Sequence, residues 1–435
     1  MGQDTKIQWA DHTFNPWRGC TKVAAGCANC YAEALSKRNP GVLGVWGFDG
    51  ARVVASEAMW REPVKWNRMS ACVCRKEAAD YEHEPGCPQR VRPRVFGASL
   101  CDVFEDWRGD LRRGDRRLHV PRSGGEWIDE SPEWSFSGCR PLTLDDVRLR
   151  LFGLIDATPN LDWLLLTKRP ENIRRMWPTP SWSLCRDGSG LVSHDIIGGK
   201  CRRCDGGRRD NVWLGTSVAC QDDADSNVPE LLKCRDLCAK VFLSVEPLIG
   251  PVLLENCWDH ARNLLVATLS GESIRVEDDD AEIVENFPPI DWVVVGGESG
   301  PNARPCDVEW IRSVVRKCRA AGVPVFVKQL GARPFDSIPN GYSSTWPSLV
   351  ASGSFSSFER WVNKAASHIG GRDVVCLDAA GRTCAIGRDF MRARDENTFP
   401  VRWHDVMRLR DPKGGDPAEW PEDLRVREVP YSRRS

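Results

Sequence analysis

Short apolar runs recur along the chain, and within each run the apolar residues are continuous instead of alternating with polar ones. Six runs are clearest, and they cover residues 94–99, 162–167, 212–217, 240–246, 291–297 and 324–328. Continuous apolarity indicates strands that are buried on both faces, as in a parallel sheet.

Between these runs, apolar residues repeat at helical spacing. Residues 144–157 follow Thr143, a good N-cap, and residues 308–321 end before Gly322 and Pro324, which stop a helix. Strand and helix therefore alternate along the chain. This alternation predicts an α/β fold, either a (β/α) barrel or an open doubly wound sheet.

Nearly every predicted strand ends in small or polar residues. These ends are Ser99–Asp102, Thr167–Arg169, Thr216–Ser217, Ser244–Glu246, Gly297–Ser299 and Lys328–Gln329. The carboxyl ends of parallel strands lie at one edge, where active sites are built, so we expect a shared polar site there. The alternative is ordinary solvated loop starts.

Three stretches interrupt the alternation and are interpreted as insertions over this edge: residues 67–93, 107–142 and 178–210. The acidic stretch 269–286 is expected to be a solvated connection. After residue 332 the pattern fades. We therefore predict a barrel domain over 1–332, with its insertions, and a C-terminal appendage of mixed structure over 333–435.

The composition narrows the class of protein. Apolar residues make up 41% of the chain, enough for a sizeable core, and 60 basic against 61 acidic residues exclude a protein that coats nucleic acid by charge alone. No apolar run is long enough for a transmembrane span, and residues 1–6 lack the features of a secretory signal. The 19 Cys then point to metal binding or catalysis in a reducing compartment, the cytoplasm.

The strongest motif is a group of three cysteines, Cys20, Cys27 and Cys30, with the spacing C-x6-C-x2-C before a helical run at 32–37. Three thiolates can hold three irons of a [4Fe–4S] cluster and leave the fourth iron open. No fourth Cys lies nearby in the sequence. The alternatives are a zinc site completed by His12 or a distant Cys, or three free cysteines.

Two of the insertions each carry four candidate metal ligands. The sets are Cys72, Cys74, His83 and Cys87, and Cys185, His194, Cys201 and Cys204. Each set can close a tetrahedral zinc site or hold a second Fe–S cluster, although neither spacing is a standard pattern. The alternative is a loop with unpaired thiols.

Arginine and tryptophan are interleaved at several places, among them residues 60–68, 107–117, 174–177 and 202–203. Because Arg holds phosphates and Trp stacks on bases, nucleic acid or a nucleotide is a candidate partner. The alternative is a solvated basic face balanced by acidic loops.

The chain resembles the bacteriophage three-Cys-motif family of phage proteins of unknown function, and more broadly the radical S-adenosylmethionine (SAM) superfamily. The matching residues are Ile7–Asp11, Asn15–Cys20, Gly26–Glu33, Pro63–Arg68, Ser99–Phe104, Leu165–Glu171, Trp213–Ser217, Phe242–Leu248, Gly296–Gly300, Ala320–Pro324 and Lys328–Gln329. The superfamily's common spacing is C-x3-C-x2-C, so the first gap here is longer. Asn29 also stands where the superfamily usually has an aromatic residue.

The resemblance implies a partial radical-SAM-type barrel and an enzyme. Cys20, Cys27 and Cys30 would hold a [4Fe–4S] cluster that cleaves SAM to a 5′-deoxyadenosyl radical for hydrogen abstraction. A nucleobase or nucleotide is the candidate substrate, for modification or repair. The expected partners are a reductant protein that donates electrons and a three-Cys-motif partner protein, in the cytoplasm of a phage host.

Several residues at the strand ends are candidates for binding SAM. They are Ser99, Asp102, Lys168, Thr216, Ser217, Glu246 and Glu298. Asp102 stands at the second-strand position and can accept a hydrogen bond from the SAM ammonium. Lys168 or Arg169 can pair with the carboxylate of SAM. Thr216 or Ser217 can form a hydrogen bond with the ribose. The Gly-Gly-Glu at 296–298 ends a late strand, so the superfamily's amino-binding role is not transferred to it. The competing interpretation is a non-catalytic adaptor or nucleic-acid-binding module stabilised by zinc or an Fe–S cluster.

Overall fold

The computed structural model describes most of the chain. Full descriptions cover residues 5, 7–70, 92–122, 125–130, 138–178, 207–275, 281–300, 302–335 and 409–430, and elsewhere only the backbone of short strands or strand ends is described.

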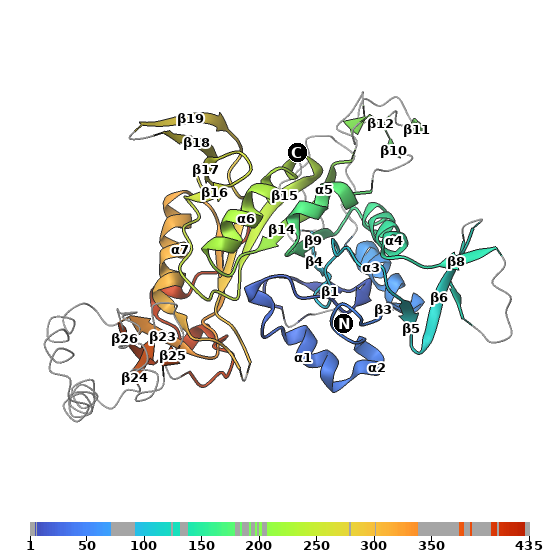
Figure 1. Cartoon of the computed structure of the whole chain (residues 1–435), viewed down its shortest axis with the longest axis horizontal. Coiled ribbons are helices and arrows are strands. Elements are labelled where there is room, and N and C mark those ends of the chain that lie inside the picture. The colour runs from blue at the N-terminus through green and yellow to red at the C-terminus, as the bar shows by residue number, and fades with distance from the viewer. Residues whose placement is uncertain are drawn as a thin grey trace, which may run out of the picture.

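Seven parallel strands form the central sheet, which curls into an open half-barrel (Figure 1). In spatial order they are β1 (His12–Phe14), β4 (Arg94–Gly97), β9 (Asp162–Thr167), β14 (Arg209–Ser217), β15 (Cys238–Val245), β20 (Trp292–Gly296) and β22 (Val325–Gln329). The spatial order follows the chain order, as right-handed crossovers in one direction require. The predicted parallel α/β sheet is confirmed, and each of the six predicted runs forms one of its strands.

Helices cover the outer, convex face of the sheet. They are α3 (Glu57–Met69), α4 (Leu144–Asp156), α6 (Gln221–Leu232) and α7 (Val308–Ala320). The predicted helix at 144–157 is confirmed: the Thr143 hydroxyl accepts from the Asp146 amide and the Asp146 carboxylate accepts from the Thr143 amide, a capping box. Outward-facing residues such as Leu165, Leu214 and Leu243 join these helices in one hydrophobic cluster.

The connection from β15 to β20 contains an antiparallel sheet where the other crossovers have helices. It comprises β16 (Cys257–Asp259), β17 (Leu264–Ala267), β18 (Glu272–Glu277) and β19 (Asp280–Asn286). The expected solvated connection at 269–286 does join β15 to β20, and most of residues 281–286 are exposed. The segment also forms paired antiparallel strands, which the sequence analysis did not predict.

Part of the predicted insertion at 107–142 forms a second small sheet. Its strands are β2 (Trp17–Arg18), β3 (Arg52–Val54), β5 (Leu111–Arg113), β6 (Arg116–Pro121), β7 (Ile128–Asp129) and β8 (Cys139–Pro141). Figure 1 shows β6 and β8 extending sideways beyond α4 and away from the half-barrel, so this part of the insertion does not cover the carboxyl edge.

Most of the other two insertions lies outside the described residues. Of 67–93, residues 67–69 end α3 and residues 71–91 are not described. Within 178–210, β14 begins at Arg209, and backbone is described for β10 (Ser183–Leu184), β11 (Leu191–Val192), β12 (Ile196–Ile197) and β13 (Lys200–Cys201).

The end of the chain returns to the half-barrel. A five-stranded sheet comprises β21 (Cys306–Asp307), β23 (Pro334–Ser337), β26 (Arg402–Val406), β24 (Val374–Leu377) and β25 (Thr383–Cys384). Beyond it, the Val327 amide donates to the Val426 carbonyl at 2.8 Å, and Trp420 and Leu424 are buried in the main cluster. The last described residues thus cover the free edge of β22, which would otherwise expose unpaired backbone groups.

The remaining helical elements are short. They are η1 (Ala25–Cys27), α1 (Tyr31–Arg38), α2 (Pro40–Leu43), η2 (Pro170–Asn172), α5 (Ile173–Met176), η3 (Arg235–Leu237), η5 (Pro417–Glu419) and η6 (Glu422–Leu424). None of the helices in the described ranges has the length and apolarity needed to span a membrane.

Candidate functional site at the carboxyl edge of the half-barrel

The concave face of the half-barrel has an aromatic floor. Its large side chains are Trp9, Phe96, Trp213, Phe242, Trp292 and Phe326, which pack as one buried cluster. The Trp213 and Trp292 rings meet edge to face with centroids 6.0 Å apart. Gly215 lies over this floor, and a Cβ there would lie 2.4 Å from the Phe242 ring, so only glycine leaves room for that ring.

Two positions further along the strands, the inward-facing side chains become polar. Ser244 follows Phe242 by two residues, and Lys328 follows Phe326 by two, so strand alternation puts each pair on the same face. The concave face therefore changes from apolar to polar toward the carboxyl ends of the strands.

The loop that carries the three cysteines lies across these strand ends. Cys20 follows β2, Cys27 ends η1, and Cys30 is the N-cap of α1. A Cβ on Gly26 would lie 3.3 Å from Ala219 Cβ, 3.5 Å from Pro247 Cδ and 3.8 Å from Lys168 Cε. These three residues follow β14, β15 and β9, so the structure brings the cysteine loop and the polar strand ends to one edge.

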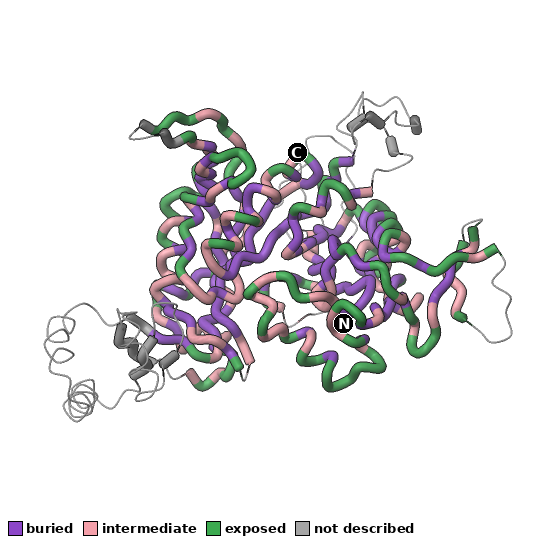
Figure 2. Tube along the Cα trace, viewed as in Figure 1, coloured by how far each residue is buried: buried purple, intermediate pink, exposed green. Residues whose placement is uncertain are grey.

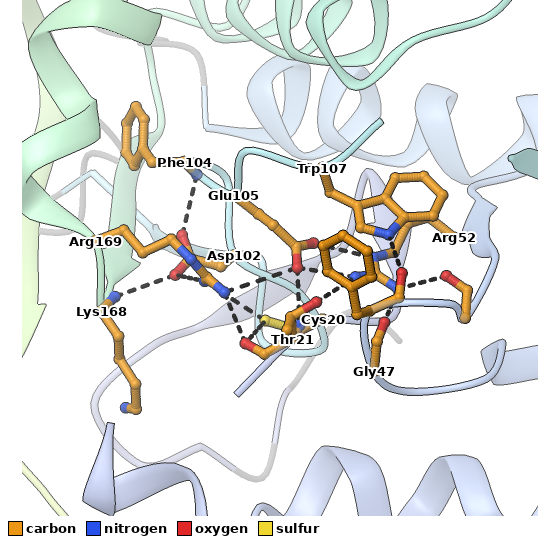
Figure 3. A network of polar contacts seen from close by, with 12 residues as sticks. Cys20, Thr21, Gly47, Arg52, Asp102, Phe104, Glu105, Trp107, Lys168 and Arg169 are labelled. Atoms are coloured by element: carbon orange, nitrogen blue, oxygen red, sulfur yellow. Dashed lines mark hydrogen bonds and ion pairs between the residues drawn. The ribbon is translucent and has the colours of Figure 1, made fainter. Parts of the chain in front are cut away.

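A buried ion pair fixes the chain directly after Cys20 (Figure 3). The Arg52 guanidinium donates to both oxygens of Glu105, at 3.0 and 2.9 Å, and both side chains are almost completely buried. The same Glu105 carboxylate accepts from the Thr21 amide at 2.8 Å. Arg52 also stacks on Trp107 at 4.4 Å from the ring centroid.

Asp102 and Arg169 form a second buried pair, which reaches Cys20. The Arg169 guanidinium donates to Asp102 at 2.8 Å, to the Thr21 carbonyl at 2.7 Å and to Cys20 Sγ at 3.7 Å. Asp102 also accepts from the Thr167 hydroxyl and from the Phe104 and Lys168 amides. Its carboxylate is thus occupied by four protein donors, and it positions Arg169 against the cysteine loop.

The surroundings of Cys20 favour its neutral thiol. Burial and the nearby carboxylates of Glu105 and Asp102 raise the pKa of Cys20 to about 12, and the Arg169 guanidinium offsets only part of this. A cation bound at the sulfur, such as a metal, would reverse this preference because it stabilises the thiolate.

On the far side of the edge, Glu298 ties the cysteine loop to the end of β20. Arg304 donates to both Glu298 oxygens, at 2.7 and 2.9 Å, and its Nη1 donates to the Ala25 carbonyl at 3.0 Å. Asn29 Nδ2 donates to Glu298 at 3.0 Å. Burial alone would raise the pKa of Glu298, but the hydrogen bonds from Arg304 and Asn29 outweigh it and hold the pKa below its ordinary value.

Glu246 pairs with Lys328 across the glycine-containing end of β20. Lys328 Nζ lies 2.6 and 2.9 Å from the two Glu246 oxygens, and Gln329 Nε2 donates to Glu246 at 3.0 Å. The strand between them, β20, ends at Gly296, where a Cβ would lie 2.9 Å from the Gln329 carbonyl oxygen. Glycine at this position permits the close approach of β22.

The other predicted residues differ in their availability to a ligand. The Ser99 hydroxyl bonds to Asn15, and the Ser99 carbonyl accepts from Tyr31 at 2.6 Å. Thr216 is completely buried and donates to the Thr167 carbonyl at 3.0 Å. Ser217 is buried on the concave side. Within the described ranges no acceptor is bonded to Lys168 Nζ, which Figure 3 shows extending away from the network.

The described residues contain no group of three His, Cys, Asp or Glu side chains placed to hold a metal ion. Cys20, Cys27 and Cys30 are partly buried free thiols. The structure does not describe the side chains of the two further predicted ligand sets, Cys72, Cys74, His83 and Cys87, and Cys185, His194, Cys201 and Cys204, so the zinc predictions lie outside the described residues.

Sequence reasoning missed one thiol beside the loop. The Gly19 amide donates to the Leu100 carbonyl at 3.1 Å, which places Cys101 alongside Cys20. Burial raises the pKa of Cys101 well above its ordinary value, and the neighbouring Cys20 adds to this rise. It also missed Arg52, Glu105 and Arg304. Arg52 and Glu105 pair across 53 positions, and Arg304 reaches the Ala25 carbonyl across 279 positions, although its other partner, Glu298, is near in the sequence. The only available signal was that Glu105 and Arg304 are charged residues that follow predicted strands.

Comparison with known proteins gives one family. The family described as protein of unknown function (DUF5131) matches residues 4–109 and 142–376. The unmatched interval, 110–141, coincides with strands β5 to β8. No curated protein and no solved structure is significantly similar to the chain.

Proposed function

Because the chain belongs to the DUF5131 family, whose function is unknown, we propose its function from its own residues: a radical SAM enzyme whose [4Fe–4S] cluster is held by Cys20, Cys27 and Cys30. The observation that carries the proposal is the position of the cysteine loop across the carboxyl ends of the parallel strands β9, β14 and β15. This is the edge where parallel α/β folds build their active sites.

The three cysteines are ligands of the type that such a cluster requires. Three free thiols lie on one loop, and the Cys30 amide donates to the Cys27 carbonyl at 3.3 Å, so these two cysteines are one turn apart. Thiolates are the ligands that Fe–S clusters require, and the Arg169 guanidinium is placed to offset part of their negative charge. No three ligands are grouped for a metal ion in the described residues, so the support comes from the donor type and the loop position.

Cys20, Cys27 and Cys30 would hold the cluster, which, with an electron from a reductant protein, would supply the reducing power for cleavage of the SAM C5′–S bond to methionine and, with hydrogen from the substrate, 5′-deoxyadenosine. The chain's own residues would bind and orient SAM. Lys168, whose ammonium has no acceptor within the described ranges, would pair with the SAM carboxylate, and Ser217 would bond the ribose. The aromatic floor would exclude water from below.

A nucleobase or nucleotide is the proposed substrate, with a three-Cys-motif protein as partner and a cytoplasmic setting. The interleaved tryptophans do not support this substrate by stacking, because Trp60, Trp66, Trp107 and Trp177 are buried in the hydrophobic core. Zinc in the insertions remains part of the proposal. Asp102 would serve mainly by positioning Arg169, because its carboxylate already accepts four hydrogen bonds.

The test is anaerobic purification followed by iron, sulfide and zinc analysis. We expect about four irons per chain and formation of 5′-deoxyadenosine from SAM after reduction. Replacement of all three cysteines by Ala should abolish the electron paramagnetic resonance signal of the reduced cluster. A protein that holds zinc at this loop, or that holds a reduced cluster yet never cleaves SAM, would contradict the proposal.

One observation favours the competing interpretation, a metal-stabilised adaptor. Cys101 beside Cys20 supplies a fourth thiol, and four thiolates would saturate a structural zinc ion. Zinc content that falls in a Cys101→Ser variant would favour this module over the enzyme.

A further inference from the structure

Exposed apolar side chains are concentrated on the segment that carries the cysteine loop. Among the described residues, the large exposed hydrophobics include Val23, Tyr31, Leu35, Val42, Val45 and Phe48, which we call the apolar patch. The others, Met69, Leu149, Leu253 and Ile283, are far apart in the chain. Figure 2 shows that the ribbon of α1 and α2 is largely exposed at the edge of the molecule.

The backbone under the apolar patch is fixed. The Gly47 amide donates to the Cys20 carbonyl at 3.0 Å, and Arg52 donates to the carbonyls of Gly47 and Gly50 at 3.1 and 2.7 Å. Trp107 Nε1 donates to the Phe48 carbonyl at 2.8 Å, yet the Phe48 side chain is 77% exposed. A large apolar side chain on an anchored backbone is a preorganised contact that loses little conformational entropy when it is covered.

The charged residues between Cys20 and Gly50 are Lys22, Lys37 and Arg38 against Glu33 and Asp49, an excess of one positive charge. Lys22 and Lys37 share the Glu33 carboxylate, at 2.6 and 3.0 Å, and Arg38 ends α1. An apolar centre with this positive excess at its border complements an acidic protein. Four of the six patch residues are aliphatic, which favours a protein surface over stacked nucleobases, since stacking requires aromatic faces.

We propose that the apolar patch is the docking surface for an acidic one-electron-transfer protein. The inference rests on the proposed function, which requires an electron to reach the cysteine loop. The hydrogen bond from Gly47 to Cys20 joins the patch directly to that loop, so a donor bound there would lie against the cluster ligands. Electron-transfer encounters use small interfaces, and a patch of six side chains suits that scale.

The experiment compares two reductants on the cluster-loaded protein. Reduced flavodoxin, an acidic flavoprotein, serves as the protein donor, and titanium(III) citrate serves as a small donor that needs no docking. In a Val45→Ser, Phe48→Ser double variant we expect the rate of cluster reduction by flavodoxin to fall at least tenfold, and the rate with titanium(III) citrate to stay unchanged. The matched control is Leu149→Ser, an equally exposed leucine on α4, which should leave both rates unchanged.

Binding to flavodoxin is measured in parallel by calorimetry, and this readout needs no turnover. Equal flavodoxin rates and affinities in the wild type and the double variant would overturn the proposal, as would stronger, patch-dependent binding of single-stranded DNA or of anionic vesicles. A wild-type protein that titanium(III) citrate cannot reduce would instead refute the proposed function. In that case calorimetry decides: patch-dependent flavodoxin binding would still support the docking surface, and its absence would overturn it.

Discussion

The aromatic floor and the carboxyl edge of the half-barrel are stabilised in opposite ways. The aromatic floor, around Trp213, Phe242 and Trp292, contains large apolar rings in contact with one another. The carboxyl edge contains ion pairs such as Arg52 with Glu105 and Arg169 with Asp102. Burial of apolar area stabilises the floor directly, whereas buried ions stabilise only while each retains its partner.

Substitutions in the two regions should therefore destabilise the protein for different reasons. A shortened ring in the floor leaves a cavity, and a lost partner at the edge leaves an unpaired charge. Both are costly, but only the edge residues contact the cysteine loop, so only their loss should alter the chemistry of that loop. The predictions below test this division, starting with the largest expected effect.

Removal of one floor ring should have the largest effect on stability. Trp292→Ala removes a completely buried indole that contacts Trp213 and Phe242 and donates to the Glu428 carbonyl at 2.9 Å. We expect the free energy of unfolding to fall by about 3–5 kcal/mol. Urea titration followed by circular dichroism measures it. Trp292→Phe keeps most of the side-chain volume, so its free energy of unfolding should fall by clearly less. Equal losses in the two variants would contradict the packing argument.

Breaking the buried pair of Arg52 and Glu105 should lower the free energy of unfolding by nearly as much. Glu105→Gln removes the partner of the buried Arg52 guanidinium and weakens the acceptor of the Thr21 amide. We expect a loss of about 3 kcal/mol or more in the free energy of unfolding, because the remaining charge is buried and unpaired. A variant at the exposed, isolated pair of Lys65 and Glu62, Glu62→Gln, serves as the control and should change stability by less than about 1 kcal/mol.

Glu298 should make stability depend on pH. Its pKa lies below the ordinary value in the folded chain, so its contribution is fully present above the unfolded pKa of roughly 4.3 and is lost as the pH falls through the folded pKa. At pH 7, Glu298→Gln should lower the free energy of unfolding by roughly 1–2 kcal/mol. The difference between the variant and the wild type should shrink as the solution is acidified below pH 4. A difference that is constant with pH would rule out this carboxylate as its source.

The pair of Lys328 and Glu246 should matter little for folding. Both side chains are partly exposed, so Lys328→Met should change the free energy of unfolding by less than about 1 kcal/mol. Thermal unfolding of the two proteins checks this. A loss as large as that of Glu105→Gln would mean that the edge is uniformly structural and that the division between floor and edge fails.

The smallest effect is expected at Cys101, whose replacement should leave the iron content unchanged. If only three thiols hold the cluster, Cys101→Ser should retain the iron content of the wild type, while Cys20→Ser should lose most of it. Metal analysis of both variants, purified side by side without oxygen, makes the comparison. Iron lost equally from both would place Cys101 among the ligands.

Sequence reasoning found six of the seven strands of the central sheet but few of the interactions at the candidate site. The runs at 162–167 and 212–217 became β9 and β14, and the polar residues that follow them lie at one edge, beside the cysteine loop. However, Asp102 was expected to bind a ligand, whereas it accepts four hydrogen bonds from the protein. The segment after residue 408 was expected in an appendage, whereas Trp420 is buried in the core.

The sequence by itself determined the local elements, because hydrophobic periodicity and the capping residues at Thr143 and Asp146 act over a few neighbouring residues. Only the tertiary structure decided the polar contacts of the site. Arg52 and Glu105 are 53 positions apart, Cys20 and Arg169 are 149 apart, and Asn29 and Glu298 are 269 apart. Periodicity carries no information over such separations: each charged residue could have paired with many others, and the curl of the sheet selected one partner for each.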